Sequence, residues 1–131
     1  MAVDDLERGL AGLTASVAAV VWEADQATAT IQLISHPVFA LTGYRDVHFL
    51  GRAGAWLALV PDDERDDLAT SWATLRPGER AERVHRVRQA DGALAWVRSD
   101  VVAADVDGVA VIRGVTLDVT AAVTAQQAQL A

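Results

Sequence analysis

The sequence predicts an α+β domain in which five strands form a sheet and the helices gather on one of its faces. Three observations lead to this prediction. Two segments rich in strand-forming residues stand close together near the start, short helical segments fill the middle, and three strand-like segments separated by tight-turn dipeptides follow. Strands and helices are segregated along the chain instead of alternating regularly. This pattern favours α+β over a doubly wound architecture.

Composition and charge limit the functions open to the chain. It has 131 residues, of which 52% are hydrophobic and 22% charged, as expected for one globular domain. The formal net charge of −7 disfavours nucleic acid and anionic lipid as partners. The longest apolar run, 17–22, is far short of the roughly 20 residues that a membrane span needs. With no cysteine for disulfides or thiolate chemistry, we expect an untargeted cytoplasmic domain that does not insert into a membrane.

The first segment, 1–16, has the spacing of an amphipathic helix. Its apolar residues recur at intervals of three and four, and acidic residues fall between them. Such a stripe could pack on the domain's own sheet or pair with a second copy as a short coiled coil. We favour a contribution to a homodimer, with a seam formed by Leu6, Leu10 and Leu13.

The main domain, 17–119, begins with a predicted hairpin and a helical middle. Two strand-like segments, 17–24 and 28–35, are separated by three residues, a spacing suited to a tight connection. From 36 to 75 the apolar pattern becomes helical and is interrupted repeatedly by glycine. The clearest helix opens at Pro61, because proline followed by three acidic residues is typical of a helix start.

A β-meander and an exit helix complete the predicted domain. The dipeptides Asp91-Gly92 and Asp107-Gly108 are strong tight-turn signals. They separate three predicted strands at about 80–90, 93–104 and 109–119. A helix rich in alanine and glutamine follows over 120–131 and is expected to leave the domain as a signalling linker.

Four stretches of the sequence resemble a known family. In chain order they read ISHPVFALTGYRDVHFLG, WLALVPDDERDDL, RVRQADGALAWV and GVTLDVT. Together they are similar to the PAS fold with its C-terminal PAC motif, and the resemblance covers roughly residues 17–123. It implies a five-stranded antiparallel sheet in the order 2-1-5-4-3, with helices that enclose a pocket against one face.

The resemblance also implies a function. PAS domains are sensory or signal-transmission modules of larger proteins, here of the histidine kinase (two-component) or cyclic-dinucleotide enzyme type, and are not enzymes. Such a module would bind a small molecule internally, form a homodimer, or do both, and would have a covalently attached output domain. A ligandless dimerisation module is the nearest alternative. A small cone-shaped α+β hydratase or isomerase is a further one, but its acid–base pair would need a carboxylate partner for His85 that the sequence does not indicate.

Departures from the family pattern narrow the cofactors. Flavin photoreceptors of this family form an adduct with the cysteine of an Asn-Cys-Arg motif, and a chain without cysteine excludes that chemistry. Thr116 stands where flavin-binding relatives have an inward glutamine. Haem-binding relatives use a histidine on the long middle helix, and residues 62–75 contain none. We therefore expect neither flavin nor haem, and leave an unidentified small molecule open.

Candidate ligand-binding residues lie where the elements are expected to enclose the pocket. On the strand at 80–90, the period of two places His85 on one face with Arg83 and Val87. The resemblance places a ligand-facing residue at His85, and a hydrogen-bonded structural histidine is the alternative. Trp72 adds a large apolar face with one donor on the middle helix. The full predicted lining is Phe39, Trp56, Trp72, His85, Ile112 and Thr116.

No metal or catalytic residue is predicted. The three histidines fall in separate segments without ligand spacing. The acidic run 62–67 lacks the alternating oxygen ligands and the glycine of a calcium loop, and helix capping explains it.

Two residues at the end of the last strand are predicted to couple the pocket to the exit helix. Asp118 or Thr120 can cap that helix through its free backbone N–H groups. A bond from Asp118 to an arginine on a neighbouring strand would add the coupling.

Overall fold

The structure is a computed structural model that describes residues 19–130. The predicted helix over 1–16, and with it the seam formed by Leu6, Leu10 and Leu13, lies outside the described residues. The homodimer assigned to that seam therefore stays a prediction.

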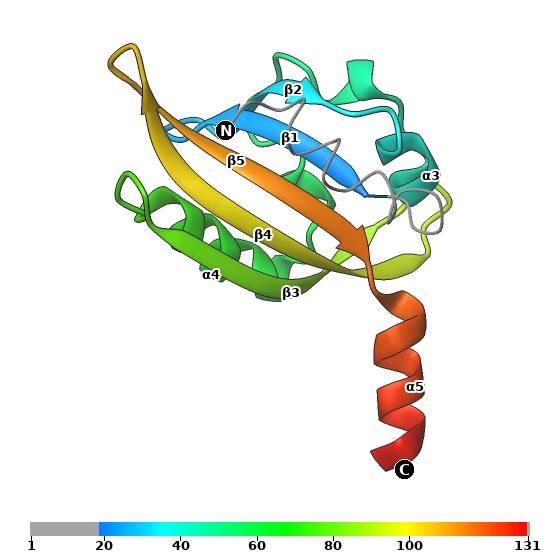
Figure 1. The fold of residues 1–131 in the computed structure, drawn as a ribbon. Helices are drawn as coiled ribbons and strands as arrows, with labels where there is room; N and C mark the ends of the chain where they lie inside the picture. Colours follow the sequence, from blue (N-terminus) through cyan, green and yellow to red (C-terminus); the bar gives the residue numbers. More distant parts are fainter. Residues whose placement is uncertain (1–18, 131) are drawn as a thin grey trace.

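The described residues form one five-stranded sheet, and its neighbouring strands are antiparallel (Figure 1). Its order is β2-β1-β5-β4-β3, which confirms the α+β class and the order implied by the resemblance. The first and last strands of the chain thus lie side by side in the centre, and β3 is an edge strand. The strands are β1 (Val20–Asp25), β2 (Thr30–Ile34), β3 (Arg80–Arg88), β4 (Leu94–Val106) and β5 (Val109–Asp118).

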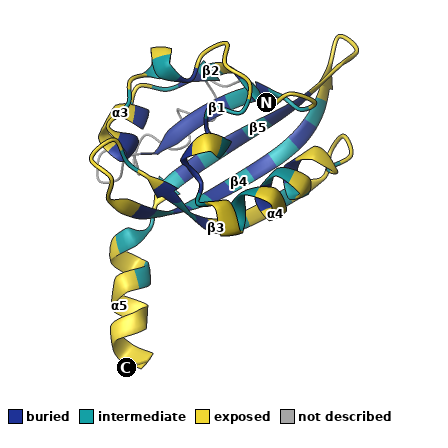
Figure 2. Ribbon diagram, turned by 180° about the vertical axis from the view of Figure 1, so that it is seen from behind, coloured by how far each residue is buried: buried dark blue, intermediate teal, exposed yellow. Residues whose placement is uncertain are grey.

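Helical segments between β2 and β3 cover one face of the sheet, as predicted (Figures 1 and 2). They are α3 (Val38–Thr42), η1 (Asp46–His48), η2 (Leu57–Leu59) and α4 (Asp62–Ala73). α4 opens immediately after Pro61 with three acidic residues in its first turn, where they compensate the helix dipole. The last helix, α5 (Thr120–Leu130), projects away from the body of the domain (Figure 1). Within residues 19–130 no helix is long and apolar enough to cross a membrane.

The turn between β4 and β5 has the geometry that its sequence predicts. Val106 pairs with Val109, so that Asp107 and Gly108 form a two-residue loop, and both have positive φ angles of 52° and 82°. This is the combination that a type I′ hairpin turn requires. The Asp105 carboxylate accepts a hydrogen bond of 2.9 Å from the Gly108 N–H and holds the loop. β4 consequently extends to Val106, two residues beyond the predicted end.

The core lies between the inner face of the sheet and the helical layer, and Figure 2 shows these inner surfaces as buried. Trp22 on β1 pairs with Gly114 on β5, and its indole covers that glycine. A Cβ atom at position 114 would collide with the indole ring, so this close contact depends on glycine. The inner face is thereby kept flat enough for a tryptophan to lie across the central strands.

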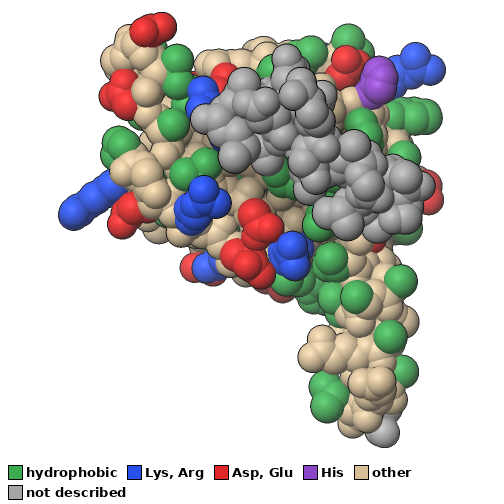
Figure 3. Space-filling model, viewed as in Figure 1, with side chains coloured by type: hydrophobic (Ala, Val, Ile, Leu, Met, Phe, Trp, Pro, Cys, Tyr) green, Lys and Arg blue, Asp and Glu red, His purple; other side chains and the backbone are tan. Residues whose placement is uncertain are grey.

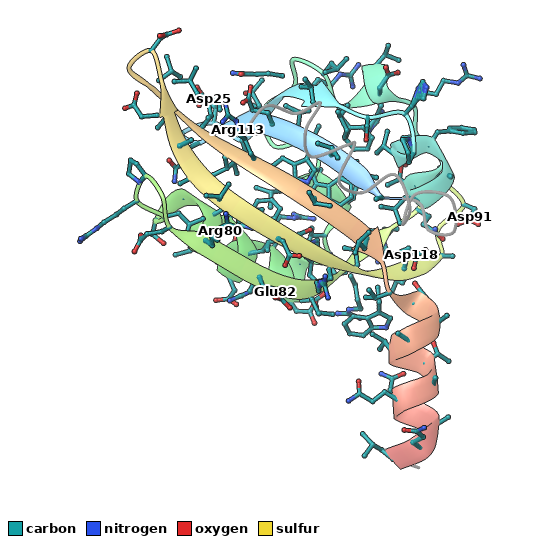
Figure 4. The ribbon with its side chains drawn as sticks, in the orientation of Figure 1. Asp25, Arg80, Glu82, Asp91, Arg113 and Asp118 are labelled. Carbon is teal, nitrogen blue, oxygen red and sulfur yellow. The ribbon has the colours of Figure 1, made fainter. Side chains whose placement is uncertain are left out.

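The outer face of the sheet is partly polar. Figure 3 shows acidic and basic side chains interspersed there, and Figure 4 places Arg80 and Glu82 on β3 and Arg113 on β5. Arg113 Nε lies 2.8 Å from Glu23 Oε1 across the β1–β5 pair. Ion pairs on this face, such as Arg113–Glu23, are partly exposed, so they contribute little to stability. Their charged groups mainly keep this face hydrated.

Candidate functional site

A row of buried polar side chains crosses the inner face of the sheet. Trp22 Nε1 donates to Thr116 Oγ1 at 3.0 Å, the Thr116 and Ser99 hydroxyls lie 2.8 Å apart, and Ser99 Oγ lies 3.1 Å from His85 Nε2. The four residues come from β1, β5, β4 and β3, and each is at most 4% exposed. Four strands are therefore linked by side chains as well as by their backbones.

The direction of every hydrogen bond in this row follows from its two ends. The indole of Trp22 can only donate, and the Arg86 carbonyl, 3.4 Å from His85 Nδ1, can only accept. With a neutral imidazole, the ring proton of His85 therefore resides on Nδ1, so Ser99 donates to His85 Nε2 and Thr116 donates to Ser99. In this arrangement each hydroxyl donates once and accepts once.

Burial also favours the neutral imidazole. Desolvation lowers the pKa of His85 below its ordinary value of 6.5, and the positive charge of Arg83 lowers it further. The hydrogen bond to the Arg86 carbonyl and the negative charge of Glu64 act in the opposite direction without reversing the shift. At neutral pH the ring is thus an uncharged member of the polar row.

Two tryptophans of the helical layer stand against His85. The ring centroids of Trp56 and Trp72 lie 6.4 and 6.2 Å from the centroid of the His85 ring, at interplanar angles of 89° and 80°. The ring centroids of Trp72 and Trp22 lie 5.2 Å apart. His85, Trp56 and Trp72 therefore form an aromatic cluster against the polar row.

Hydrogen bonds from neighbouring elements fix the positions of the two tryptophans. Gln26, just after β1, donates to the carbonyls of Trp72 and Leu75 at 2.9 and 2.8 Å and so ties down the end of α4. Arg65 on α4 donates to the carbonyls of Leu57 and Val60 at 2.9 and 3.0 Å, which holds the η2 segment that follows Trp56. The Trp72 carbonyl, which accepts from Gln26, lies in the last turn of α4, where the helix itself leaves carbonyls unpaired.

Among residues 19–130, nothing accepts a hydrogen bond from the indole N–H groups of Trp56 and Trp72. Both Nε1 atoms are buried, and the two residues are 5% and 4% exposed. A buried donor without an acceptor costs about 1–3 kcal/mol. Trp22, on the same face, has its acceptor in Thr116. Trp56 and Trp72 thus differ from the polar row, whose side chains hydrogen-bond to one another.

A groove of about 390 Å³ runs between α4 and β3 and reaches His85. Arg83 forms an ion pair with Asp67 in its wall. Next to it, Arg86 Nε lies 2.8 Å from Glu64 Oε2, and its Nη2 lies 3.1 Å from Asp63. The acidic residues of α4 thus bind β3 in addition to starting the helix. The lining consists of Asp63, Glu64, Asp67, Leu68, Arg83, Val84 and His85.

The predicted pocket residues are partly brought together. Trp56, Trp72, His85, Ile112 and Thr116 are all buried between the sheet and the helices. The prediction for Phe39 is wrong, because its side chain is 52% exposed and lies beneath the guanidinium of Arg45 at 5.5 Å. α3 instead turns its other residues inward, and these are Val38, Leu41 and Thr42.

The start of α5 is anchored to β4. The Trp96 N–H donates to Thr120 Oγ1 at 2.9 Å, and the Val119 N–H donates to the Trp96 carbonyl at 2.9 Å. Asp118, at the end of β5 in Figure 4, accepts from the Thr120 N–H at 2.8 Å. Among residues 19–130 no ion pair joins Asp118 to an arginine, so the expected bond is not the link.

Two residues that the sequence analysis did not select, Arg86 and Trp96, bring α4 and the start of α5 into contact with the same strand pair. The guanidinium of Arg86 lies 5.8 Å from the ring centroid of Trp96, its cross-strand partner. Because Arg86 also binds Glu64, one side chain contacts both α4 and the residue that anchors α5. The strand alternation alone could have placed Arg86 and Trp96 side by side once the register was known.

No metal centre is evident in the described part of the chain. No group of three or more His, Asp or Glu side chains within 19–130 is placed to hold an ion.

The sheet order and the one-sided helical layer define a small α+β module whose interior lies between sheet and helices. A family model described as PAS fold matches residues 32–116. The chain belongs to this PAS-fold family. No curated protein sequence matches the chain.

Solved structures share the fold. A sensory box histidine kinase/response regulator from Burkholderia thailandensis has a TM-score of 0.71 at 20% identity, covering 95% of this chain and 91% of that one. The N-terminal domain of a diguanylate cyclase with PAS/PAC sensor from Marinobacter aquaeolei has 0.68 at 19%, covering 78% and 95%. The PAS domain of an HTR-like protein from Haloarcula marismortui has 0.65 at 19%, covering 88% and 95%.

Proposed function

We propose that this PAS domain is a sensor that binds a small molecule on the inner face of its sheet and transmits the event through α5. The buried, unpaired N–H groups of Trp56 and Trp72 support binding most directly, because they require an acceptor that the described chain does not supply. Structural neighbours described as a histidine kinase and a diguanylate cyclase support a covalently attached output domain of that kind.

The transmission route runs along the edge of the sheet. A ligand next to His85 contacts α4, and α4 is bound to Arg86 through Asp63 and Glu64. Arg86 lies over Trp96, whose backbone holds the first turn of α5. Binding that shifts α4 would thus change the population of α5 orientations without breaking the sheet.

The proposal treats the domain as a sensor and not as an enzyme. An enzymatic site would need an acid–base pair in the interior. His85 instead bonds to Ser99 and a backbone carbonyl, and Glu64, whose charge acts on His85, is bound to Arg86. The proposal likewise includes no flavin–thiol adduct, since the chain has no cysteine, and no resident haem.

A ligandless dimerisation module is the second candidate, and one experiment separates the two. Native mass spectrometry of the purified chain reports bound small molecules and oligomeric state together. A sensor should carry, or take up, a small molecule. A protein that is dimeric, carries no small molecule and takes up none would contradict ligand sensing and favour the dimerisation module.

Hydrogen exchange then tests transmission. Binding should change the protection of the amides of Trp96, Val119 and Val123, which are hydrogen-bonded at the start of α5. An Arg86→Gln variant should still bind but lose this change. Arg88→Gln is the matched control, because Arg88 lies on the same strand and its side chain makes one hydrogen bond among the described residues, to the Gly92 carbonyl. A change that persists in Arg86→Gln would refute the route.

A further inference from the structure

The unpaired groups of the interior define the chemistry of the molecule that they would bind. We propose that the ligand is an uncharged, largely apolar small molecule with a carbonyl-type oxygen acceptor, held by the Nε1–H groups of Trp56 and Trp72. This inference rests on the proposed sensory function and specifies its ligand.

The site offers donors and no free acceptor. In the polar row, Trp22 donates to Thr116, the hydroxyls satisfy each other, and both nitrogens of His85 are engaged. The two remaining polar atoms of the inner layer, within residues 19–130, are the indole nitrogens of Trp56 and Trp72, which can only donate. A ligand that presents an acceptor relieves the cost that these two donors already impose on the protein, whereas a ligand N–H or O–H group does not.

One small molecule can serve both donors. Trp56 and Trp72 each lie within 6.4 Å of the His85 ring, measured between centroids, and they approach it from two different elements. Both indole rings are therefore neighbours of His85. His85 also lines the groove between α4 and β3, so this groove lies next to the aromatic cluster, and under the proposal it is the side from which a molecule would enter.

The charges around this groove argue against an ionic ligand. Three carboxylates line it, from Asp63, Glu64 and Asp67, and the one lining arginine, Arg83, is paired with Asp67. Arg86 is likewise occupied by Asp63 and Glu64. An anion would meet a negative entrance and then only neutral donors inside, which do not offset the cost of burying a charge. A cation would find no acceptor in the interior.

The remaining surroundings are hydrocarbon. The core that contains Trp56 and Trp72 also contains aliphatic side chains from α4, β3, β4 and β5, each at most 2% exposed. Such surroundings favour an apolar body behind the acceptor atom. The aliphatic residues are Leu68, Val87, Val97 and Ile112.

The indole N–H signals allow a direct test on the full chain. The chain has four tryptophans, so a ¹H–¹⁵N spectrum separates the donors expected to bind from those that are not. We would titrate cyclohexanone as an uncharged acceptor against cyclohexane, cyclohexanecarboxylate and cyclohexylammonium, which keep the ring and change the polar group. Cyclohexanone should shift the Trp56 and Trp72 indole protons downfield in a saturable manner, with smaller shifts for Trp22 and Trp96.

Matched variants measure the contribution of each donor. Trp56→Phe and Trp72→Phe each remove one N–H and should weaken cyclohexanone binding by about tenfold. Trp96→Phe removes an indole N–H on the outer face of the sheet but keeps an aromatic ring beneath Arg86 and the backbone bonds to Val119 and Thr120, so it should leave the affinity unchanged. If a core variant fails to fold, the wild-type titration with the four probes still decides the matter.

The outcomes separate this inference from the proposed function. Equal affinity for cyclohexane, or tighter binding of the carboxylate or the ammonium, would overturn the acceptor class while leaving ligand sensing intact. If no probe perturbs the Trp56 and Trp72 signals and native mass spectrometry finds no small molecule, both proposals fail. Saturable downfield shifts confined to these two indoles, with the tenfold losses, would support the inference.

Discussion

Replacing Thr116 by valine tests whether the polar row on the inner face is a connected, directional network. The substitution replaces the hydroxyl by a methyl group and keeps the branched shape of the side chain, so the main change is the loss of a hydrogen-bonding group. Two bonds disappear, the 3.0 Å bond from Trp22 and the 2.8 Å bond to Ser99. All three residues are at most 4% exposed, so water cannot replace the lost partner of the indole.

The magnitude follows from these contacts. A buried donor left without an acceptor costs about 1–3 kcal/mol, and the lost Thr116–Ser99 bond adds about 1 kcal/mol. We therefore expect Thr116→Val to lower the free energy of unfolding by about 2–4 kcal/mol. Urea denaturation at pH 7 measures this change, and an unchanged m-value would show that both states keep their exposed area.

Two further measurements make the test specific. Thr124→Val is the matched control, because Thr124 is exposed on α5, and its free energy of unfolding should change by less than about 0.5 kcal/mol. In Thr116→Val the indole proton of Trp22 should move upfield, since it has lost its acceptor. If Thr116→Val lowers the free energy of unfolding by less than about 0.5 kcal/mol and leaves the Trp22 indole proton signal where it is, the network is refuted.

Three other predictions concern stability and assembly. Because the folded-state pKa of His85 lies below 6.5, the unfolded chain takes up this proton first as the pH falls. Between pH 7 and 5 the wild type should therefore lose stability relative to His85→Gln, by at most about 1.4 kcal/mol per pH unit in urea titrations. Parallel stability curves for the two proteins would contradict this. Gly114→Ala should lower the free energy of unfolding by about 1–3 kcal/mol, because the added methyl group collides with Trp22. An unchanged free energy of unfolding with an unchanged near-UV circular dichroism spectrum would disprove the contact. If the helix predicted over 1–16 forms a homodimer seam, Leu10→Asp should give a folded monomer in sedimentation velocity. A variant that stays dimeric or unfolds would instead assign that helix to the domain's own core.

Local signals were sufficient for most of the element boundaries. Pro61 and the acids after it start α4, and Asp107-Gly108 closes the last hairpin, because each dipeptide or run has few competing conformations. The order of the strands depends on contacts between distant residues, such as Trp22 with Gly114. Such pairings leave no periodic trace in the chain, and the order came from the resemblance to a family.

The site was predictable to the extent that strand alternation determines it. His85 points inward as the period of two requires, and the same rule could have found Ser99, which shares a face with the buried residues Val97 and Val101. Phe39 was misplaced because α3 has only five residues, too few for a periodic pattern to define its buried side. That the Trp56 and Trp72 donors are unpaired depends on every neighbouring acceptor, which no local pattern contains.

The link between the interior and α5 depends on the position of β3 at the edge of the sheet. Arg86 belongs to the outer face by alternation, where it meets Trp96, yet its side chain also reaches Glu64 on the helix that covers the inner face. A side chain in a central strand has neighbouring strands on both sides and cannot pass from one layer to the other. An edge strand has this freedom on its open side. The groove and the arginine that lies over Trp96 therefore share the α4–β3 boundary, and under the proposed function a ligand that widens this boundary would act directly on the anchor of α5.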